Sequence, residues 1–284
     1  AAFVPAGVRF IQGSLLDDEA LRSALSGDID GVVHLAGYKY AGESVKVPLH
    51  TYEQNVTATV RLLVAMADAG VNRIVFSSSA AVYGTPSVDQ VTESTATAPE
   101  SPYGQTKLIG EWLVADQAKA TGLVHTSLRY FNVVGSGDSS VRDTSPHNLF
   151  PLVFRALSEG RTPSINGDDY PTPDGTCVRD YVHVADIARA HVGAAKRMFA
   201  GQSIDAIYNL GAGDGTSVRQ IMTVAAEVTG IGFEPEIRGR RAGDPARIVA
   251  SGERAAADLG WKNTHDLPSM MSTAWSAWQA SSVE

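Results

Sequence analysis

The chain has 284 residues, of which 44% are hydrophobic and 19% are charged, and these values suit a globular protein that buries a full core. The net charge of -8 at pH 7 argues against a general nucleic-acid surface, because phosphate binding needs clustered lysines and arginines. A single cysteine, Cys177, excludes an intramolecular disulfide, and no Cys/His spacing typical of a metal site is present. With no apolar run of about 18 residues and no signal-like start, we expect a cytoplasmic protein without membrane partners.

Short apolar runs alternate with amphipathic stretches through the first half of the chain. We expect strands at residues 8–12, 31–35, 73–77 and 126–130, and helices at residues 17–25, 51–69 and 103–120. This alternation predicts a parallel sheet with helices on both faces, which is a doubly wound Rossmann-type α/β fold.

The pattern changes after residue 134. Loops rich in Asp, Ser, Gly and Pro are expected at residues 135–146 and 166–175, helices at 149–159, 184–199, 218–229 and 267–279, and short strands at 207–210 and 234–238. We therefore expect residues 1–134 to form the Rossmann-type domain and residues 135–284 to form a smaller C-terminal α/β lobe interleaved with the sheet.

The N-terminal part of the sequence lacks the first unit that is typical of a doubly wound nucleotide-binding sheet. Such sheets begin with a strand, a glycine-rich turn and a helix, whose backbone N–H groups meet a pyrophosphate. The glycine-rich residues 211–215 lie too late for this role and are expected to form a strand-to-helix turn. Either the first strand–helix–strand unit is absent or dinucleotide binding is absent, and the motifs below favour the first option. If these residues are the whole molecule, weak retention of a dinucleotide is expected.

The strongest chemical signal is the pair Tyr103 and Lys107, four residues apart at the start of a predicted helix and therefore on one face. A tyrosine acts as a general base at neutral pH only if its pKa falls by about three units, or ~4 kcal/mol. One cation at ~4 Å in an effective dielectric of ~20 supplies about that much. The spacing alone is weak, because a pair on a helix surface has it too.

Three serines, Ser77 to Ser79, end the strand that precedes this helix. Ligands bind outside the carboxyl ends of parallel strands, so we expect Ser79 to lie near Tyr103. Capping of the strand end is the competing role for these hydroxyl groups.

The set Ser79, Tyr103 and Lys107 resembles the extended short-chain dehydrogenase/reductase family. Finer motifs are similar to those of the UDP-glucose (UDP-galactose) 4-epimerases along nearly the whole chain, with about one N-terminal strand–helix–strand unit absent. These motifs are LAGYK at 35–39, GES at 42–44, SSSAAVYG at 77–84, LRYFN at 128–132, GDDYPTPDGT at 167–176, VRDY at 178–181 and RAGD at 241–244.

The resemblance implies an isomerase that interconverts UDP-glucose and UDP-galactose through a tightly held NAD. The sugar is oxidised at C4, the 4-keto sugar rotates, and hydride returns to its other face. Tyr103 would take the proton of the 4-hydroxyl group, Lys107 would hold the nicotinamide ribose and lower the tyrosine pKa, and Ser79 would relay the proton or fix the 4-oxygen.

Further residues are assigned by the same resemblance. Those expected to bind the cofactor are Ser14, Leu15, Leu35, Ala36, Gly37, Lys39, Asn55, Ser77, Tyr103, Lys107 and Phe131, with Gln54 as an alternative to Asn55. Those expected to bind the UDP-hexose are Ser79, Tyr103, Asn132, Asn148, Leu149, Arg179, Arg241, Asp244 and Ile248.

Three of these positions carry alternatives or departures. Ser14 stands where many relatives have Asp, so its contact with adenine is in doubt. Arg179 suits a diphosphate, since a guanidinium makes bidentate bonds, but a salt bridge with Asp180 or another acid competes. Ile248 falls where the family sets the width of the sugar pocket, which predicts UDP-glucose and UDP-galactose and leaves N-acetylated sugars open.

Other functions stay open. Another nucleotide-sugar epimerase, acting on UDP-glucuronate or UDP-N-acetylglucosamine, is one alternative, and a catalytically silent nucleotide-binding relative is another. A dehydratase usually has acidic residues directly after the serine at the strand end, and because Ser79 is followed by alanines, this activity is disfavoured. The helices at residues 51–69 and 103–120 resemble the pair that forms the dimer interface of the family, so a homodimer is expected.

Overall fold

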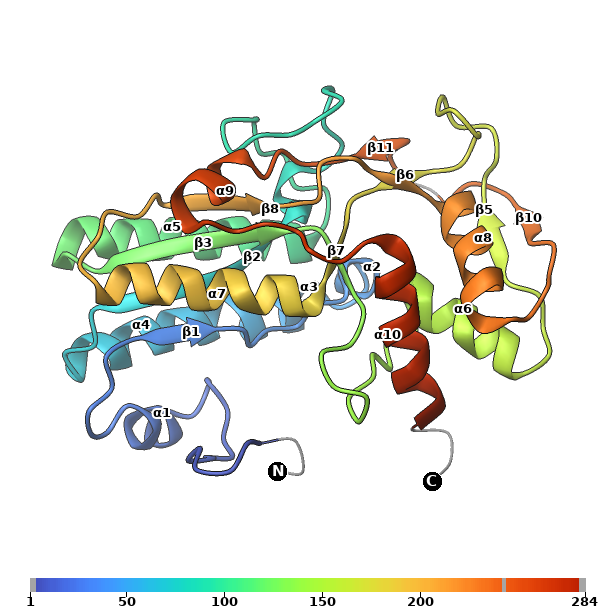
Figure 1. The fold of residues 1–284 in the computed structure, drawn as a ribbon. Helices are drawn as coiled ribbons and strands as arrows, with labels where there is room; N and C mark the ends of the chain where they lie inside the picture. Colours follow the sequence, from blue (N-terminus) through green and yellow to red (C-terminus); the bar gives the residue numbers. More distant parts are fainter. Residues whose placement is uncertain (1–3, 242–243, 281–284) are drawn as a thin grey trace. The chain divides into compact units, whose positions relative to one another are not determined.

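The computed structural model describes residues 4–241 and 244–280. The chain divides into two compact units built from interleaved segments (Figure 1). Unit 1 comprises Ala1–Gly84, Thr95–Arg129 and His191–Tyr208, and unit 2 comprises Thr85–Ser94, Tyr130–Ala190 and Asn209–Glu284. The boundary expected at residue 134 stays a prediction.

The main sheet, which lies mostly in unit 1, is built from short strands that lie far apart in the sequence. Its order is β1 (Val32–His34), β2 (Arg73–Ser79), β3 (Val124–Tyr130) and β8 (Ile207–Leu210). The pair β1 and β2 is parallel, with Val33 opposite Val75, as the sequence predicted. Successive side chains of β2 point to opposite faces, so Phe76 and Ser78 meet one helix layer while Ser77 meets the other.

Helices cover both faces of this sheet. Gly110 of α5 (Pro102–Thr121) packs on the Phe76 ring, and His191, in the part of α7 (Val184–Phe199) that belongs to unit 1, contacts Ser77. Ser101 caps α5 by accepting a hydrogen bond from the Gly104 N–H, and Gly122 ends the helix in the left-handed region at φ +75°. The core between the layers contains Leu21, Leu25, Leu62, Leu63, Met66, Val71, Ile74, Phe76, Val114 and Leu123.

The long helix predicted at residues 51–69 is present as a continuous helical stretch. After α2 (Ala41–Ser44), the chain forms α3 (Pro48–Tyr52), a π-helical segment Glu53–Thr57, and then α4 (Ala58–Asp68) without a gap. The π-helical segment within this stretch was not predicted.

The strand predicted at residues 8–12 is also wrong. Val8 and Phe10 are 57% and 55% exposed, and none of the strands in the described ranges pairs with this segment. An alternating sequence becomes a strand only where a neighbour completes its backbone hydrogen bonds. The segment instead leads to α1 (Asp18–Ala24), which Asp17 caps by accepting hydrogen bonds from the N–H groups of Glu19 and Ala20.

Unit 2 is built around helices and short strand pairs. The helices α6 (Leu149–Ser158), α8 (Val218–Thr229) and α10 (Leu267–Ala280) lie at the predicted positions, whereas α9 (Glu253–Leu259) was not predicted. The strands pair as β4 (Asn132–Val134) with β7 (Tyr181–His183), β5 (Ser164–Asn166) with β10 (Glu236–Arg238), and β6 (Val178–Arg179) with β9 (Thr216–Ser217) and β11 (Arg247–Ile248). The core contains Phe150, Val153, Phe154, Leu157, Ile165, Tyr181, Ile221, Met222, Ala225, Met270 and Met271.

Within residues 4–241 and 244–280, none of the helices combines the length and the apolar character needed to span a lipid bilayer. In the same part of the chain, no three His, Cys, Asp or Glu side chains come together in a way that could hold a metal ion.

Candidate active site

The predicted pair Tyr103 and Lys107 lies at the start of α5. The Lys107 Nζ atom is 5.9 Å from the centroid of the Tyr103 ring and 5.4 Å from that of Phe76. It also donates a hydrogen bond of 2.9 Å to the carbonyl oxygen of Ser77. Burial lowers the pKa of Lys107 to about 8. The site thus holds an ammonium group, largely charged at neutral pH, in a poorly solvated place beside a tyrosine ring.

Ser79 lies at the end of β2, and its neighbourhood touches the start of α5. A Cβ atom added to Gly104 would lie 2.6 Å from the carbonyl oxygen of Ala81, so the two segments are in close backbone contact. The Ser79 Oγ atom accepts a hydrogen bond from the Ala81 N–H at 3.2 Å, which is the competing capping role. Ser44 also supports the helix start, since its Oγ atom accepts from the Tyr103 N–H at 3.1 Å.

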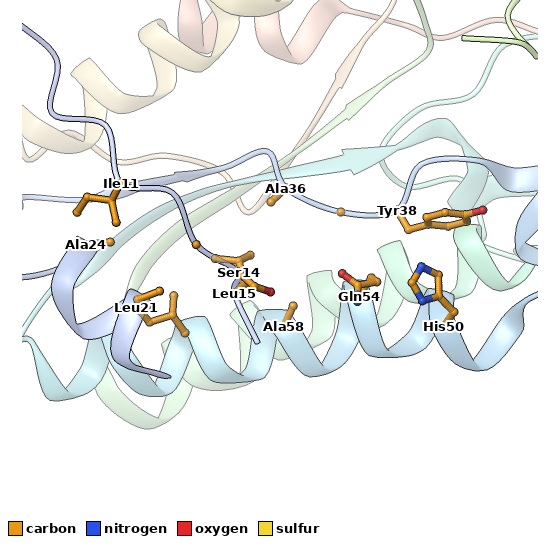
Figure 2. Close-up of a pocket in the computed structure, with 13 residues that line it drawn as sticks. Ile11, Ser14, Leu15, Leu21, Ala24, Ala36, Tyr38, His50, Gln54 and Ala58 are labelled. Atoms are coloured by element: carbon orange, nitrogen blue, oxygen red, sulfur yellow. The ribbon is translucent and has the colours of Figure 1, made fainter. Parts of the chain in front are cut away.

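A cavity of about 480 Å³ lies in unit 1 and contains much of the predicted cofactor site (Figure 2). Its wall includes the predicted Ser14, Leu15, Ala36 and Gly37. Gln54, the alternative to Asn55, also lines it, and residues that the sequence had not assigned complete the lining: Ile11, Gly13, Ala20, Leu21, Ala24, Tyr38, His50 and Ala58. The wall is therefore mainly apolar, with a few polar groups that include the hydroxyl of Ser14 and the amide of Gln54, as is common for nucleotide and cofactor sites.

The sequence left open whether Asn55 or Gln54 contacts the cofactor, and the structure gives the two side chains different surroundings. The Asn55 side chain accepts a 2.6 Å hydrogen bond from the Tyr38 N–H and donates to the Tyr38 carbonyl oxygen and to Thr106 Oγ1. Asn55 therefore holds the loop after β1 against α5 from behind, whereas Gln54 lines the cavity. The π-helical segment allows both side chains to serve the site, as such turns often do.

Gly37 links the cavity to the tyrosine–lysine pair. A Cβ atom at this position would lie 3.0 Å from Asn55 Oδ1 and 3.6 Å from Lys107 Nζ. The absence of a side chain therefore lets the loop pass directly beside Lys107.

Other residues predicted to bind the cofactor lie elsewhere. Leu35 is 64% exposed, and Lys39 lies over the Tyr40 ring at 5.8 Å; neither lines the cavity. Ser77 is fully buried, with its Oγ atom 3.0 Å from His191 Nε2, so it supports Lys107 from inside the sheet. Phe131 belongs to unit 2.

The sequence did not predict one buried pair of charged side chains, which joins α5 to β3. The Arg129 guanidinium makes two hydrogen bonds to the Glu111 carboxylate, at 2.8 and 2.6 Å, and a third to Tyr83 Oη at 2.9 Å. Burial lowers the pKa of Arg129, but the hydrogen bonds and charge of Glu111 outweigh it and raise that pKa overall. One signal was available, because Glu111 continues the four-residue spacing of Tyr103 and Lys107 on α5.

Several predicted substrate residues come together in unit 2. Arg179 lies opposite Ile248 in the pair β6 and β11, and its guanidinium is 3.6 Å from the Asp244 carboxylate. Its acidic partner is therefore not Asp180, which accepts hydrogen bonds from the backbone N–H groups at 212, 213 and 250. Asn132 adjoins this group, since its N–H donates to the Asp180 carbonyl oxygen at 3.0 Å.

The remaining predicted substrate residues flank this group. Asn148 precedes α6, and its side chain donates a 2.6 Å hydrogen bond to Asp143. Leu149 begins α6 and is followed by Phe150, whose ring stacks on that of Tyr181 at 6.0 Å. The carbonyl oxygen of Arg241 accepts from the Asp244 N–H at 3.3 Å.

Comparison with known proteins identifies the class to which this fold and site belong. The chain belongs to the NAD dependent epimerase/dehydratase family, whose model matches residues 1–221. The resemblance to this family and the Rossmann-type α/β fold are therefore confirmed, and NAD is the family's cofactor.

Within the family, curated relatives of high similarity are UDP-glucose 4-epimerases. The one from Corynebacterium glutamicum is 45% identical over 276 residues, covering 96% of this chain and 83% of the relative. The one from Streptomyces lividans is 43% identical, covering 99% of this chain and 85% of the relative.

Solved structures give the same result. The chain superimposes on a UDP-glucose 4-epimerase with a TM-score of 0.93 and 38% identity, covering 98% of this chain and 86% of the other. It superimposes on the UDP-glucose 4-epimerase from Brucella ovis in complex with NAD with a TM-score of 0.89 and 39% identity, covering 94% and 83%.

The residues of unit 1 fit NAD. The cavity has an apolar wall, and the loop at Gly37 approaches Lys107 so closely that a Cβ atom would fill the space between them. Ser14, Leu15, Ala36, Gly37 and Gln54 line this cavity and would hold the cofactor.

Proposed function

We propose that this chain interconverts UDP-glucose and UDP-galactose by inverting the configuration at C4. The observation that carries the proposal is the buried Lys107 ammonium beside the Tyr103 ring, at the carboxyl end of a strand in a member of this family. A protein that only binds nucleotide has no need for a buried cation next to a tyrosine.

NAD, when bound, supplies the acceptor and donor of the C4 hydride. Tyr103 takes the proton of the 4-hydroxyl group and returns it after the sugar has turned over. The charge of Lys107 favours the phenolate form of Tyr103, because an opposite charge at short range stabilises an anion in a poorly solvated site. The carbonyl oxygen of Ser77 and the Phe76 ring keep this ammonium in place. Ser79, at the strand end, holds the 4-oxygen.

In unit 2, the group formed by Arg179, Asp244 and Asn132 is proposed to hold the UDP part of the substrate. The guanidinium of Arg179 would bind the diphosphate and the Asp244 carboxylate would bind the uridine ribose. The 3.6 Å pair between them brings both groups together, and it is also the salt bridge that competes with the diphosphate for Arg179.

The test is conversion of UDP-galactose to UDP-glucose by the NAD-loaded chain. Tyr103→Phe keeps the ring beside Lys107 and removes only the hydroxyl, so we expect turnover to fall by about 10²–10⁴-fold, the usual contribution of a general base. Tyr52→Phe is the matched control, because it removes a hydroxyl that bonds to Gln105 at 2.7 Å outside the cavity and should leave turnover unchanged.

Absence of turnover by the unaltered, NAD-loaded chain would overturn the proposal in favour of a silent nucleotide-binding relative. The same assay with UDP-N-acetylglucosamine and UDP-glucuronate decides between sugars. Ile248, which lies in β11 opposite Arg179, is the residue that we propose sets this preference.

The predicted homodimer remains a proposal, as does the cytoplasmic location. Apolar side chains on the two helices expected at the dimer interface support association, since Val64 of α4 and Trp112 of α5 are 57% and 56% exposed.

A further inference from the structure

The Glu111–Arg129 pair lies behind the active site, and its contacts reach the strand end that carries Ser79. Glu111 follows Lys107 by one turn of α5 and is 5% exposed. Its Oε1 atom accepts a hydrogen bond of 2.5 Å from the hydroxyl of Ser78. Ser78 immediately precedes Ser79, so the helix that carries Tyr103 is bonded to the residue beside the predicted 4-oxygen ligand.

The same ion pair also holds the other end of this segment. Arg129 binds both carboxylate oxygens of Glu111 and donates to Tyr83 Oη at 2.9 Å, with its guanidinium 4.9 Å from the centroid of the Tyr83 ring. Tyr83 ends the short turn Ala80–Tyr83 that follows Ser79. The segment from 79 to 82 is therefore fixed at one end to the carboxylate and at the other end to the guanidinium of one buried ion pair.

We propose that Glu111 and Arg129 are positioning residues, which act through Ser78 and Tyr83 to hold Ser79 in register with Tyr103. This inference rests on the proposed function. The physical reason is that the backbone contact between Ala81 and Gly104 brings the strand end and the helix start together, while the side-chain hydrogen bonds of Glu111 and Arg129 fix the segment between them. Charged hydrogen bonds in a buried place are short and directional, so they suit this task.

Ser78→Ala is the sharpest single test, because it removes one hydroxyl group and leaves both hydrogen bonds between Arg129 and Glu111 intact. We expect kcat to fall at least about tenfold while KM for UDP-galactose stays within about twofold, since geometry at the reacting atoms is lost and binding is not. Ser127→Ala is the matched control. Ser127 is equally buried on the neighbouring strand β3, and its hydroxyl has no hydrogen-bond partner among the described residues, so kcat should not change.

A double-mutant cycle separates positioning from a general loss of structure. If Ser78 acts through Ser79, then Ser78→Ala should change kcat by less than about twofold when Ser79→Ala is already present. If Ser78 only stabilises the fold, it should lower kcat by the same factor in both backgrounds. The midpoint of thermal unfolding of each variant shows whether it is folded.

Tyr83→Phe serves as a second variant if Ser78→Ala does not fold, because it keeps the ring beside Arg129 and leaves the Glu111–Arg129 pair intact, and it should show the same dependence on Ser79. The outcomes are distinct. Absence of turnover by the unaltered chain rejects the proposed function, whereas normal turnover combined with full activity of Ser78→Ala, or with equal losses in both backgrounds, rejects the positioning role.

Discussion

Lys107 is a charged side chain that is only 7% exposed, and its burial has a cost. Because burial lowers the pKa of Lys107 to about 8 from its ordinary value of 10.5, the folded state disfavours the ammonium form. At pH values below 8 both the folded and unfolded states carry the proton, and the fold bears the full cost of burying the charge. Between pH 8 and 10.5 the folded state releases the proton first, so this cost declines as the pH rises.

Lys107→Met should therefore increase the free energy of unfolding at pH 7 while it removes turnover. The size of the pKa shift sets the gain at no more than about 3 kcal/mol. Denaturant unfolding of both proteins from pH 7 to pH 10.5 measures it, and the difference should shrink as the pH rises. A Met variant that is less stable than the original chain at pH 7 would show that the hydrogen bond to Ser77 outweighs the desolvation of the ammonium.

At the scale of elements, α5 is the helix that organises the site. Residues 103, 107 and 111 follow its four-residue spacing, and the ammonium of Lys107 and the carboxylate of Glu111 both bond to the end of β2. The approach of this helix to the sheet depends on Gly110, because a Cβ atom there would lie 2.3 Å from the Phe76 ring. Since Phe76 also contacts Lys107, a shift of the helix at this point reaches the catalytic pair.

Gly110→Ala should destabilise the fold by about 1–3 kcal/mol, the usual cost of overpacking a core. The helix preference of alanine over glycine, about 1 kcal/mol, opposes this effect and is the smaller of the two. Gly42→Ala is the matched control, because Gly42 is also helical but a Cβ atom there has nothing within 4 Å. Denaturant unfolding should show a loss for Gly110→Ala and no loss for Gly42→Ala; equal effects would mean that Phe76 moves aside freely.

At the scale of the whole molecule, buried histidines in both units make the fold sensitive to acid. His34 of unit 1 is 3.0 Å from Thr59 Oγ1, and burial, followed by the charge of Lys107, lowers its pKa to about 4. His183 of unit 2 is 2.9 Å from Thr273 Oγ1 and stacks on His265, and burial followed by the charge of His265 lowers its pKa to about 4.

Stability should consequently fall as the pH drops from 6.5 toward 4. Over this range the unfolded state takes up protons at both histidines and the folded state does not, so each adds a slope of up to about 1.4 kcal/mol per pH unit. His34→Gln and His183→Gln should each reduce the slope of the unfolding free energy against pH, whatever they do to stability at pH 7. An unchanged slope in either variant would contradict the assignment of that histidine.

Much of this molecule could be determined from the sequence alone. The helices α5, α7 and α8 and the buried strands β2 and β8 have strong local patterns and end at residues with clear capping or turn preferences, so they were predicted within a few residues. The family and the cofactor followed from the resemblance of several motifs to known proteins, because the spacing of Tyr103 and Lys107 alone is weak. Four of the residues that this resemblance assigned to the cofactor line the cavity.

Only the tertiary structure decided the features that depend on partners distant in the sequence. The two-residue strands of unit 2 exist only through pairing with other strands, and residues 8–12 lack a partner strand within the described chain. Gln54 lines the cavity and Asn55 holds the loop after β1 because both lie in a π-helical turn. The hydrogen bonds of Glu111 reach Ser78, 33 residues away, and Arg129, 18 residues away. A buried charge is not visible in a local pattern, because what makes it tolerable is the hydrogen-bonding group that the fold brings to it.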